Sequence, residues 1–354
     1  MRTIGSRTLL AAAIGLLLAG CGQSPADRAA PAAQSADGKY VVPRTPWGDP
    51  DLQGKWPSTS MVGVPMQRDE KLGTRNVLND EEFAEREARA ARQTEQDNAD
   101  FDLESAASTP GGDVGGPVSP PPHWLERGQP QRQASLIVDP PNGRQPPLTA
   151  QAQERAAEQR KAREGRGPAD SYTDRSNYDR CITRGLAGSI LPVIYNNGTQ
   201  IVQSPGYVTI VNEMIHETRV VPLDGRPHVS SDIKMWLGDS RGHWEGDTLV
   251  VETTNFTDRT GVGVNGGGTR NSTALKITER YTRISPDRID YKMTIDDPET
   301  WTAPWTMEFP LDRDDDYGMF EYACHEGNLA MFHILSGARA DERNAAAAKP
   351  AGAR

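Results

Sequence analysis

The sequence has 354 residues and a formal net charge of −10 at pH 7. This charge argues against a general nucleic-acid binder, because such proteins need a basic surface. With 36% hydrophobic and 25% charged residues, 34 glycines and 27 prolines, the composition is typical of a loop-rich, water-facing protein and excludes a polytopic membrane protein, a coiled coil and a collagen. Three cysteines exclude a disulfide-dense miniprotein.

The N-terminus has the pattern of a bacterial lipoprotein signal. Arg2 and Arg7 flank the start of an apolar run over residues 9–18, which is too short to span a membrane and has the length of a signal-peptide core. The run leads into Leu18-Ala19-Gly20-Cys21, which resembles the bacterial lipobox, where the cysteine receives a lipid. We therefore expect residues 1–21 to be a lipoprotein signal peptide with Cys21 as the lipidation site. The alternative is an ordinary secretory signal with an incidental cysteine.

The residue after Cys21 indicates the destination. It is Gly22 rather than an aspartate, and the resemblance to lipoprotein sorting in Gram-negative bacteria then implies the outer membrane, with the body facing the periplasm or the cell exterior. The protein would contact the membrane through its lipid anchor only. Residues 22–38 are small, polar and interrupted by proline, which predicts a flexible tether.

Residues 39–170 read as a Pro/Gly-rich arm that wraps the body. Trp47 and Trp56 stand in its otherwise polar first part, which predicts that the arm packs on the body rather than moving freely. Two polar helices are expected in the arm, over 79–98 and from 149 to about 165. A short strand stopped by prolines is expected at 135–141, and a long loop at 104–122.

Residues 171–340 form the predicted β domain, followed by a disordered tail at 341–354. Short β-type runs alternate with turn signals, and the rhythm predicts a mainly β fold: an antiparallel meander that closes into an up-and-down, calycin-like barrel or packs as a sandwich, with short surface helices. The expected runs are 199–203, 207–223, 248–254, 274–284, 288–295, 301–311 and 320–324, with 236–244 read as a loop that leads into a hairpin turn at 244–247.

Alternation within three of these runs predicts which side chains face inward. Every second residue in 275–281, 289–295 and 305–309 is apolar, except Glu279, so each run has one mainly apolar face. These faces are expected to fill a core; in a barrel they could instead line a ligand cavity.

Two cysteines remain if Cys21 carries a lipid. In an oxidising compartment such a pair usually forms a disulfide, and we expect one between Cys181 and Cys324, which would tie the start of the β domain to its end. The rival hypothesis makes Cys324 a nucleophile beside His325 and Glu326. Neighbouring residues on a strand point to opposite faces, which disfavours that arrangement.

Five residues are candidates for acid–base chemistry. His216 and His325 carry the side chain that most readily exchanges protons near neutral pH, and Glu326 follows His325 in a polar cluster at a strand end. Arg219 is a candidate anion holder and Tyr322 a candidate hydrogen-bond donor. The sequence requires no cofactor, but a divalent metal on His216, His325 and Glu326 is an open alternative.

Several segments together resemble a family of secreted or lipid-anchored bacterial proteins of uncharacterised activity. They are PRTPWGDPDLQGKW at 43–56, SLIVDPPNGR at 135–144, DRCITRG at 179–185, WLGDSRGHWEGDTLVVETTNF at 236–256, DDPETWTAPW at 296–305 and EYACHEGN at 321–328. The resemblance covers roughly residues 43–340. It implies a secreted or lipid-anchored protein and names no catalytic residue.

The sequence thus predicts an outer-membrane or periplasmic lipoprotein whose β domain handles a small apolar or aromatic organic molecule. An acid–base enzyme, a lyase or a hydrolase, is the favoured form. The alternative is a non-catalytic envelope lipoprotein that binds a lipid or another ligand. No nucleic-acid partner is expected.

Overall fold

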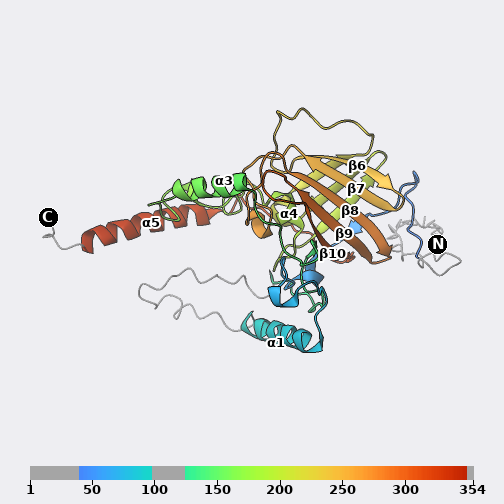
Figure 1. Cartoon of the computed structure of the whole chain (residues 1–354), viewed down its shortest axis with the longest axis horizontal. Helices are drawn as coiled ribbons and strands as arrows, with labels where there is room; N and C mark the ends of the chain where they lie inside the picture. The colour runs from blue at the N-terminus through green and yellow to red at the C-terminus, as the bar shows by residue number, and fades with distance from the viewer. Residues whose placement is uncertain (1–39, 98–123, 349–354) are drawn as a thin grey trace, which may run out of the picture.

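Two antiparallel sheets form the body of the protein (Figure 1). This computed structural model describes residues 40–97 and 124–348. The strands are β1 (Gly54–Lys55), β2 (Ile137–Asp139), β3 (Thr199–Ser204), β4 (Tyr207–Asn212), β5 (Thr218–Pro222), β6 (Asp239–Glu245), β7 (Thr248–Thr254), β8 (Lys276–Ser285), β9 (Arg288–Asp296) and β10 (Trp305–Asp312). One sheet has the order β1-β3-β4-β5 and the other β2-β10-β9-β8-β7-β6. The predicted mainly β, antiparallel fold is confirmed.

The sheets do not close into a barrel. Among the described residues, no strand pairing joins the four-stranded sheet to the six-stranded sheet, so the expected calycin-like barrel is wrong. Instead, residues from both sheets, such as Ile210 and Val221 from one and Val251 and Tyr281 from the other, belong to one hydrophobic core. A core shared between two faces is the packing of a sandwich.

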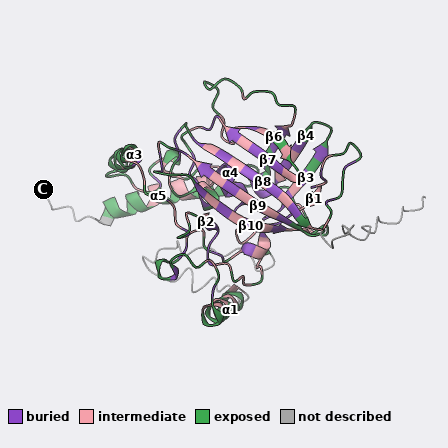
Figure 2. Ribbon diagram, turned by 45° about the vertical axis from the view of Figure 1, so that its right-hand side comes forward, coloured by how far each residue is buried: buried purple, intermediate pink, exposed green. Residues whose placement is uncertain are grey.

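The expected alternation is seen in the longest strands. Residues 289, 291, 293 and 295 of β9 are fully buried while their neighbours are partly exposed, and β8 and β10 follow the same rule (Figure 2). Because β8 pairs with β9 and β9 with β10 in register, these faces stack into one apolar layer that fills the core.

Three runs depart from expectation. The run 207–223 divides into β4 and β5, because the backbone turns at a 3₁₀ segment, Met214–His216, in which Ile215 and His216 both have a positive φ. Most of β6 (Asp239–Glu245) lies within the stretch 236–244, which was expected to be a loop. The run 320–324 is not a strand; its Phe320 N–H donates to the Glu213 carboxylate at 3.0 Å instead of to a neighbouring strand.

The helices lie mostly to one side of the sheets and below them in the view of Figure 1. The α-helices are α1 (Asp80–Asp97), α3 (Ala150–Lys161), the buried α4 (Gly185–Ile190) and α5 (Leu329–Ala348); 3₁₀ turns occupy Thr59–Met61, Glu70–Leu72, Tyr172–Asp174, Met214–His216 and Val264–Gly266. The two polar helices expected in the arm are present as α1 and α3. The tail expected to be disordered from residue 341 begins inside α5, which continues to Ala348. None of the helices in the described part of the chain is long and apolar enough to cross a membrane.

The arm contacts the body through β1 and Trp56. β1 pairs with β3 and forms one edge of the four-stranded sheet, and the neighbouring Trp56 is fully buried with its indole N–H donating to the Leu52 carbonyl at 2.8 Å. Trp47, by contrast, is 36% exposed. The expected signal peptide, the lipidation site Cys21, the tether at 22–38 and the loop at 104–122 lie outside the described residues.

Candidate ligand-binding cavity

A cavity of about 900 Å³ lies beside the start of α5. Its walls come from five separate parts of the chain: residues 124–126, the loop 178–181, the turn at 196, the turn at 213, and the segment 317–330. Five aromatic side chains line it, namely Trp124, Tyr178, Tyr317, Phe320 and Tyr322. The volume lies within the range of small-molecule sites, roughly 300–1,000 Å³. We refer to it below as the aromatic cavity.

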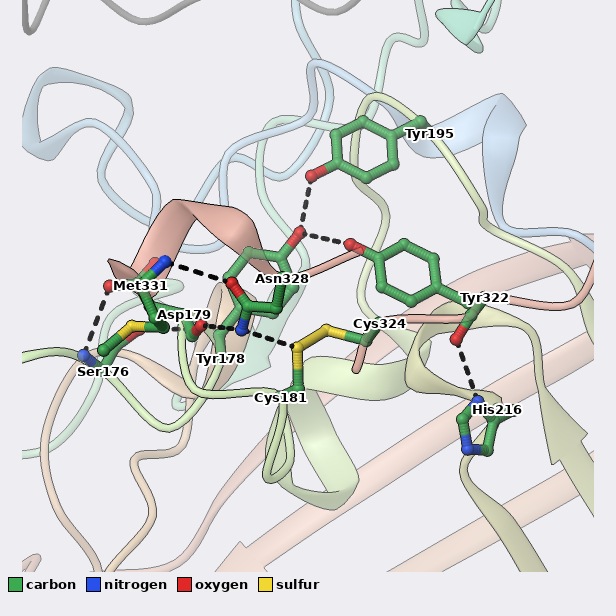
Figure 3. The surroundings of a disulfide bond; sticks show 10 residues. All are labelled: Ser176, Tyr178, Asp179, Cys181, Tyr195, His216, Tyr322, Cys324, Asn328 and Met331. Carbon is green, nitrogen blue, oxygen red and sulfur yellow. Dashed lines mark hydrogen bonds between the residues drawn. A yellow bond between two sulfur atoms is a disulfide. The ribbon is translucent and has the colours of Figure 1, made fainter. Parts of the chain in front are cut away.

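A disulfide fastens two walls of the aromatic cavity together. Cys181 and Cys324 are bonded, as predicted, across a sequence separation of 143 residues, and both line the cavity (Figure 3). Asn328 strengthens the junction by donating to the Asp179 carbonyl at 3.0 Å and to Cys181 Sγ at 3.2 Å. A bonded sulfur is not a free thiolate, so the structure gives no support to Cys324 as a nucleophile.

Three tyrosines meet through their hydroxyl groups next to the disulfide (Figure 3). The Tyr178 hydroxyl lies 2.6 Å from that of Tyr195 and 3.2 Å from that of Tyr322. Burial raises the pKa of Tyr178 and of Tyr322, so these phenols stay protonated. Tyr178 and Tyr322 line the cavity, so the cluster places hydroxyl groups, each a possible donor or acceptor, in its wall.

A second cluster joins two carboxylates through one phenol. The Tyr317 hydroxyl lies 2.8 Å from Glu126 Oε1 and 2.7 Å from Glu213 Oε2, so its single hydrogen is shared between two acceptors. Glu213 is buried and also accepts from Asn196 Nδ2 at 2.9 Å. The close approach depends on Gly198, because a Cβ there would lie 2.6 Å from the Tyr317 ring and 2.7 Å from Glu213 Oε2.

Arg184 lies behind the ring of Tyr178. Its guanidinium carbon is 5.1 Å from the ring centre, and burial lowers its pKa. Arg184 is 1% exposed and its Nε has no hydrogen-bond partner among the described residues. It contributes a positive charge close to the tyrosine cluster without lining the cavity.

Glu217 is buried near Arg184, and its ionisation makes the stability of the fold depend on pH. Burial is the largest cause of its raised pKa, although hydrogen bonds with Ser189 and Thr183 and the charge of Arg184 oppose the shift. The folded protein therefore binds a proton that the unfolded chain releases above about pH 4.3, so stability falls as pH rises through the interval up to the folded pKa.

We expect Glu217→Gln to remove this fall, because the amide does not titrate. The melting temperature, measured from pH 4 to pH 8, should decline less steeply with pH in the variant than in the wild type. Parallel profiles for the two proteins would contradict the assignment.

The structure brings only some of the predicted site residues together. Tyr322 lines the aromatic cavity, and the carbonyl of Tyr322 lies 2.9 Å from His216 Nδ1. A carbonyl only accepts, so that nitrogen carries the hydrogen. His216 is exposed on the turn between β4 and β5, and His325 and Glu326 are exposed on the turn before α5. The histidines and Glu326 therefore do not form the expected acid–base cluster within the cavity.

Arg219 lies elsewhere, in the core between the sheets. Its guanidinium pairs with both oxygens of Glu279, at 2.6 and 2.9 Å, and the hydroxyls of Tyr281 and Tyr291 also donate to Glu279, at 2.7 and 2.9 Å. Burial alone would lower the pKa of Arg219, but the Glu279 carboxylate raises it. The expected anion holder thus binds an anion of its own chain.

A metal site at the predicted residues has no support in the geometry. Across 40–97 and 124–348, no group of three or more histidine, cysteine, aspartate or glutamate side chains is placed to hold a metal ion. His216 uses one ring nitrogen on a backbone carbonyl.

Comparisons with known proteins complete the description of the cavity. No protein-family model, curated protein or solved structure matches the chain.

Proposed function

We propose that this protein is an envelope lipoprotein that binds a small organic molecule with an aromatic or apolar part. The observation that carries the proposal is the aromatic cavity itself: about 900 Å³, with five aromatic side chains in its wall and a disulfide between two of its walls. Apolar lining with a few convergent polar groups is the usual form of a small-molecule site. Here the polar groups are the tyrosine cluster and the carboxylates of Glu126 and Glu213.

The location belongs to the same proposal. The pattern Leu18-Ala19-Gly20-Cys21 after a short apolar run supports a lipid anchor at Cys21, and Gly22 supports the outer membrane of a Gram-negative bacterium. A cavity on a tethered body would then capture a molecule from the periplasm or from outside the cell.

Binding is favoured over catalysis. His216, His325 and Glu326 are exposed outside the cavity and Arg219 is buried in an ion pair. Within the cavity, the carboxylates of Glu126 and Glu213 both accept hydrogen bonds from neighbouring neutral groups that knit the walls together. Glu321 is the one carboxylate of the described wall without such a bond, whereas a lyase or a hydrolase of acid–base type needs an acid and a base arranged together at the ligand.

Ligand binding is expected to raise the melting temperature. The test screens small aromatic compounds, such as phenol, indole and benzyl alcohol, against the chain from residue 22, which contains every described residue. A ligand that binds only the folded protein stabilises it by about 2.7 kcal/mol at a hundred times its Kd.

A matched pair of variants locates the effect. A Cβ at Gly327, which lines the cavity, meets nothing within 4 Å, and the same holds for Gly337 on α5 away from the cavity. Gly327→Phe should abolish the stabilisation by filling the cavity, and Gly337→Phe should leave it intact. Equal stabilisation of both variants would contradict binding in the aromatic cavity.

A further inference from the structure

Aromatic faces give the cavity wall an affinity for positive charge. Trp124 and Phe320 are 61% and 73% exposed, so their rings are accessible at the edge of the cavity, while Tyr178, Tyr317 and Tyr322 are partly buried. The face of an aromatic ring carries partial negative charge and attracts cations, most strongly when several rings surround them.

Acidic side chains add to this attraction for cations. Glu126, Asp179, Glu213 and Glu321 line the cavity, and its described wall contains no lysine, arginine or histidine. Asp179 is compensated by Arg175 at 3.0 Å. The other three carboxylates make no ion pair with a described side chain.

Glu126 and Glu213 are held in place by neutral donors. Glu126 accepts from Thr59 Oγ1 at 2.8 Å, Asn197 Nδ2 at 2.9 Å and the Tyr317 hydroxyl at 2.8 Å. Neutral donors fix the position of a carboxylate but leave its net charge uncancelled. A cation in the cavity would cancel it.

Positive charges adjoin the wall without lining it. Arg184 lies over the ring of Tyr178. The Lys55 ammonium donates to the backbone carbonyls of Asp315 and Tyr317 at 3.0 and 2.6 Å. Neither side chain lines the cavity, so a ligand inside meets the carboxylates and the rings first.

We infer that the ligand of the aromatic cavity is an organic cation, an amine or a quaternary ammonium compound that carries apolar or aromatic groups. The inference rests on the proposed function and adds the charge of the ligand to it. Rings and uncompensated carboxylates both favour a cation, and both disfavour an organic anion.

Three probes that share one benzyl or phenyl group test the charge. Isothermal titration of the chain from residue 22 should show that benzyltrimethylammonium binds about tenfold or more tightly than benzyl alcohol, with benzoate weakest. The preference should shrink as sodium chloride is raised, because salt screens the attraction of partly exposed charges.

Charge-removing variants complete the test. Glu126→Gln should weaken benzyltrimethylammonium by about tenfold and weaken benzyl alcohol much less. Glu321→Gln, at an exposed residue of the cavity, should also weaken the binding of benzyltrimethylammonium. It replaces Glu126→Gln in the test if that variant does not fold. Glu154→Gln removes the same charge from the exposed surface of α3 and should change neither affinity.

The outcomes separate this inference from the proposed function. Equal affinities for benzyltrimethylammonium and benzyl alcohol, or tighter binding of benzoate, would overturn the cationic ligand while leaving a binding cavity. Absence of binding by all three probes would overturn both.

Discussion

Replacing both bonded cysteines, as Cys181→Ala with Cys324→Ala, is expected to lower the free energy of unfolding by about 2–5 kcal/mol. The bond closes a long loop, with 143 residues of sequence separation, and its loss frees the unfolded chain more than the folded one. Urea denaturation followed by circular dichroism measures the change.

The same variant should lose the cavity. The segment 317–328 contains no strand, so its attachment depends on the disulfide and on side-chain bonds such as those to Glu213 and from Asn328. Any ligand that stabilises the wild type should stabilise the double variant much less. Unchanged denaturation midpoints and unchanged ligand binding would show that the disulfide supports neither the fold nor the cavity.

Removing the charge of Glu279 is expected to destabilise the fold by about 3–5 kcal/mol, since Glu279→Gln leaves Arg219 charged and buried without a counterion. Arg219 and Glu279 side chains are 6% and 0% exposed, so water cannot replace the lost partner. Chemical denaturation of the single variants, Arg219→Met and Glu279→Gln, and of the double variant gives the coupling energy.

The double variant Arg219→Met/Glu279→Gln should cost less than the sum of the two single changes, because no unpaired charge remains. Glu245→Gln offers a control on the same sheet. Glu245 pairs with Arg280 at 2.7 Å, and Arg280 is next to Glu279 on β8. The side chains of Glu245 and Arg280 are both well exposed, so the expected loss of stability is below about 1 kcal/mol. Equal losses at Glu279 and Glu245 would contradict a buried, structural ion pair.

The fold was predictable where one local rule governs several residues in a row. The apolar face of β9 follows from a period of two, and burial confirms it at residues 289, 291, 293 and 295. The disulfide followed from the count of three cysteines once Cys21, in a segment that resembles a lipobox, was set aside. Both inferences need no knowledge of distant contacts.

The errors arose where tertiary contacts override local preference. Met214 and Ile215 look like strand residues, yet Ile215 adopts a positive φ and begins the turn that places Glu213 in the cavity wall. The aromatic run at 320–324 reads as a strand, but a carboxylate and a disulfide hold it instead of a neighbouring strand. The barrel failed because closure depends on which edges pair, which alternation does not specify.

Most of the cavity had no sequence signal. The bond between Tyr317 and Glu126 spans 191 positions, and the contact between Tyr178 and Tyr322 spans 144, so no spacing rule relates them. Tyr322, Cys181 and Cys324 were found because they stand in or next to conspicuous clusters. The segments 179–185 and 321–328 meet at the disulfide, so the predicted cysteine pair already indicated that two parts of the cavity wall lie together.

Native mass spectrometry of the chain from residue 22, purified without added ligand from cells that export it, tests the central claim most directly. The account predicts that the wild type has the sequence mass less two hydrogens for the disulfide, plus the mass of a bound organic molecule. Gly327→Phe should lack the bound molecule, and Gly337→Phe should retain it. The same bare mass for all three proteins, unchanged by millimolar benzyltrimethylammonium, benzyl alcohol or benzoate, would contradict a ligand-binding cavity.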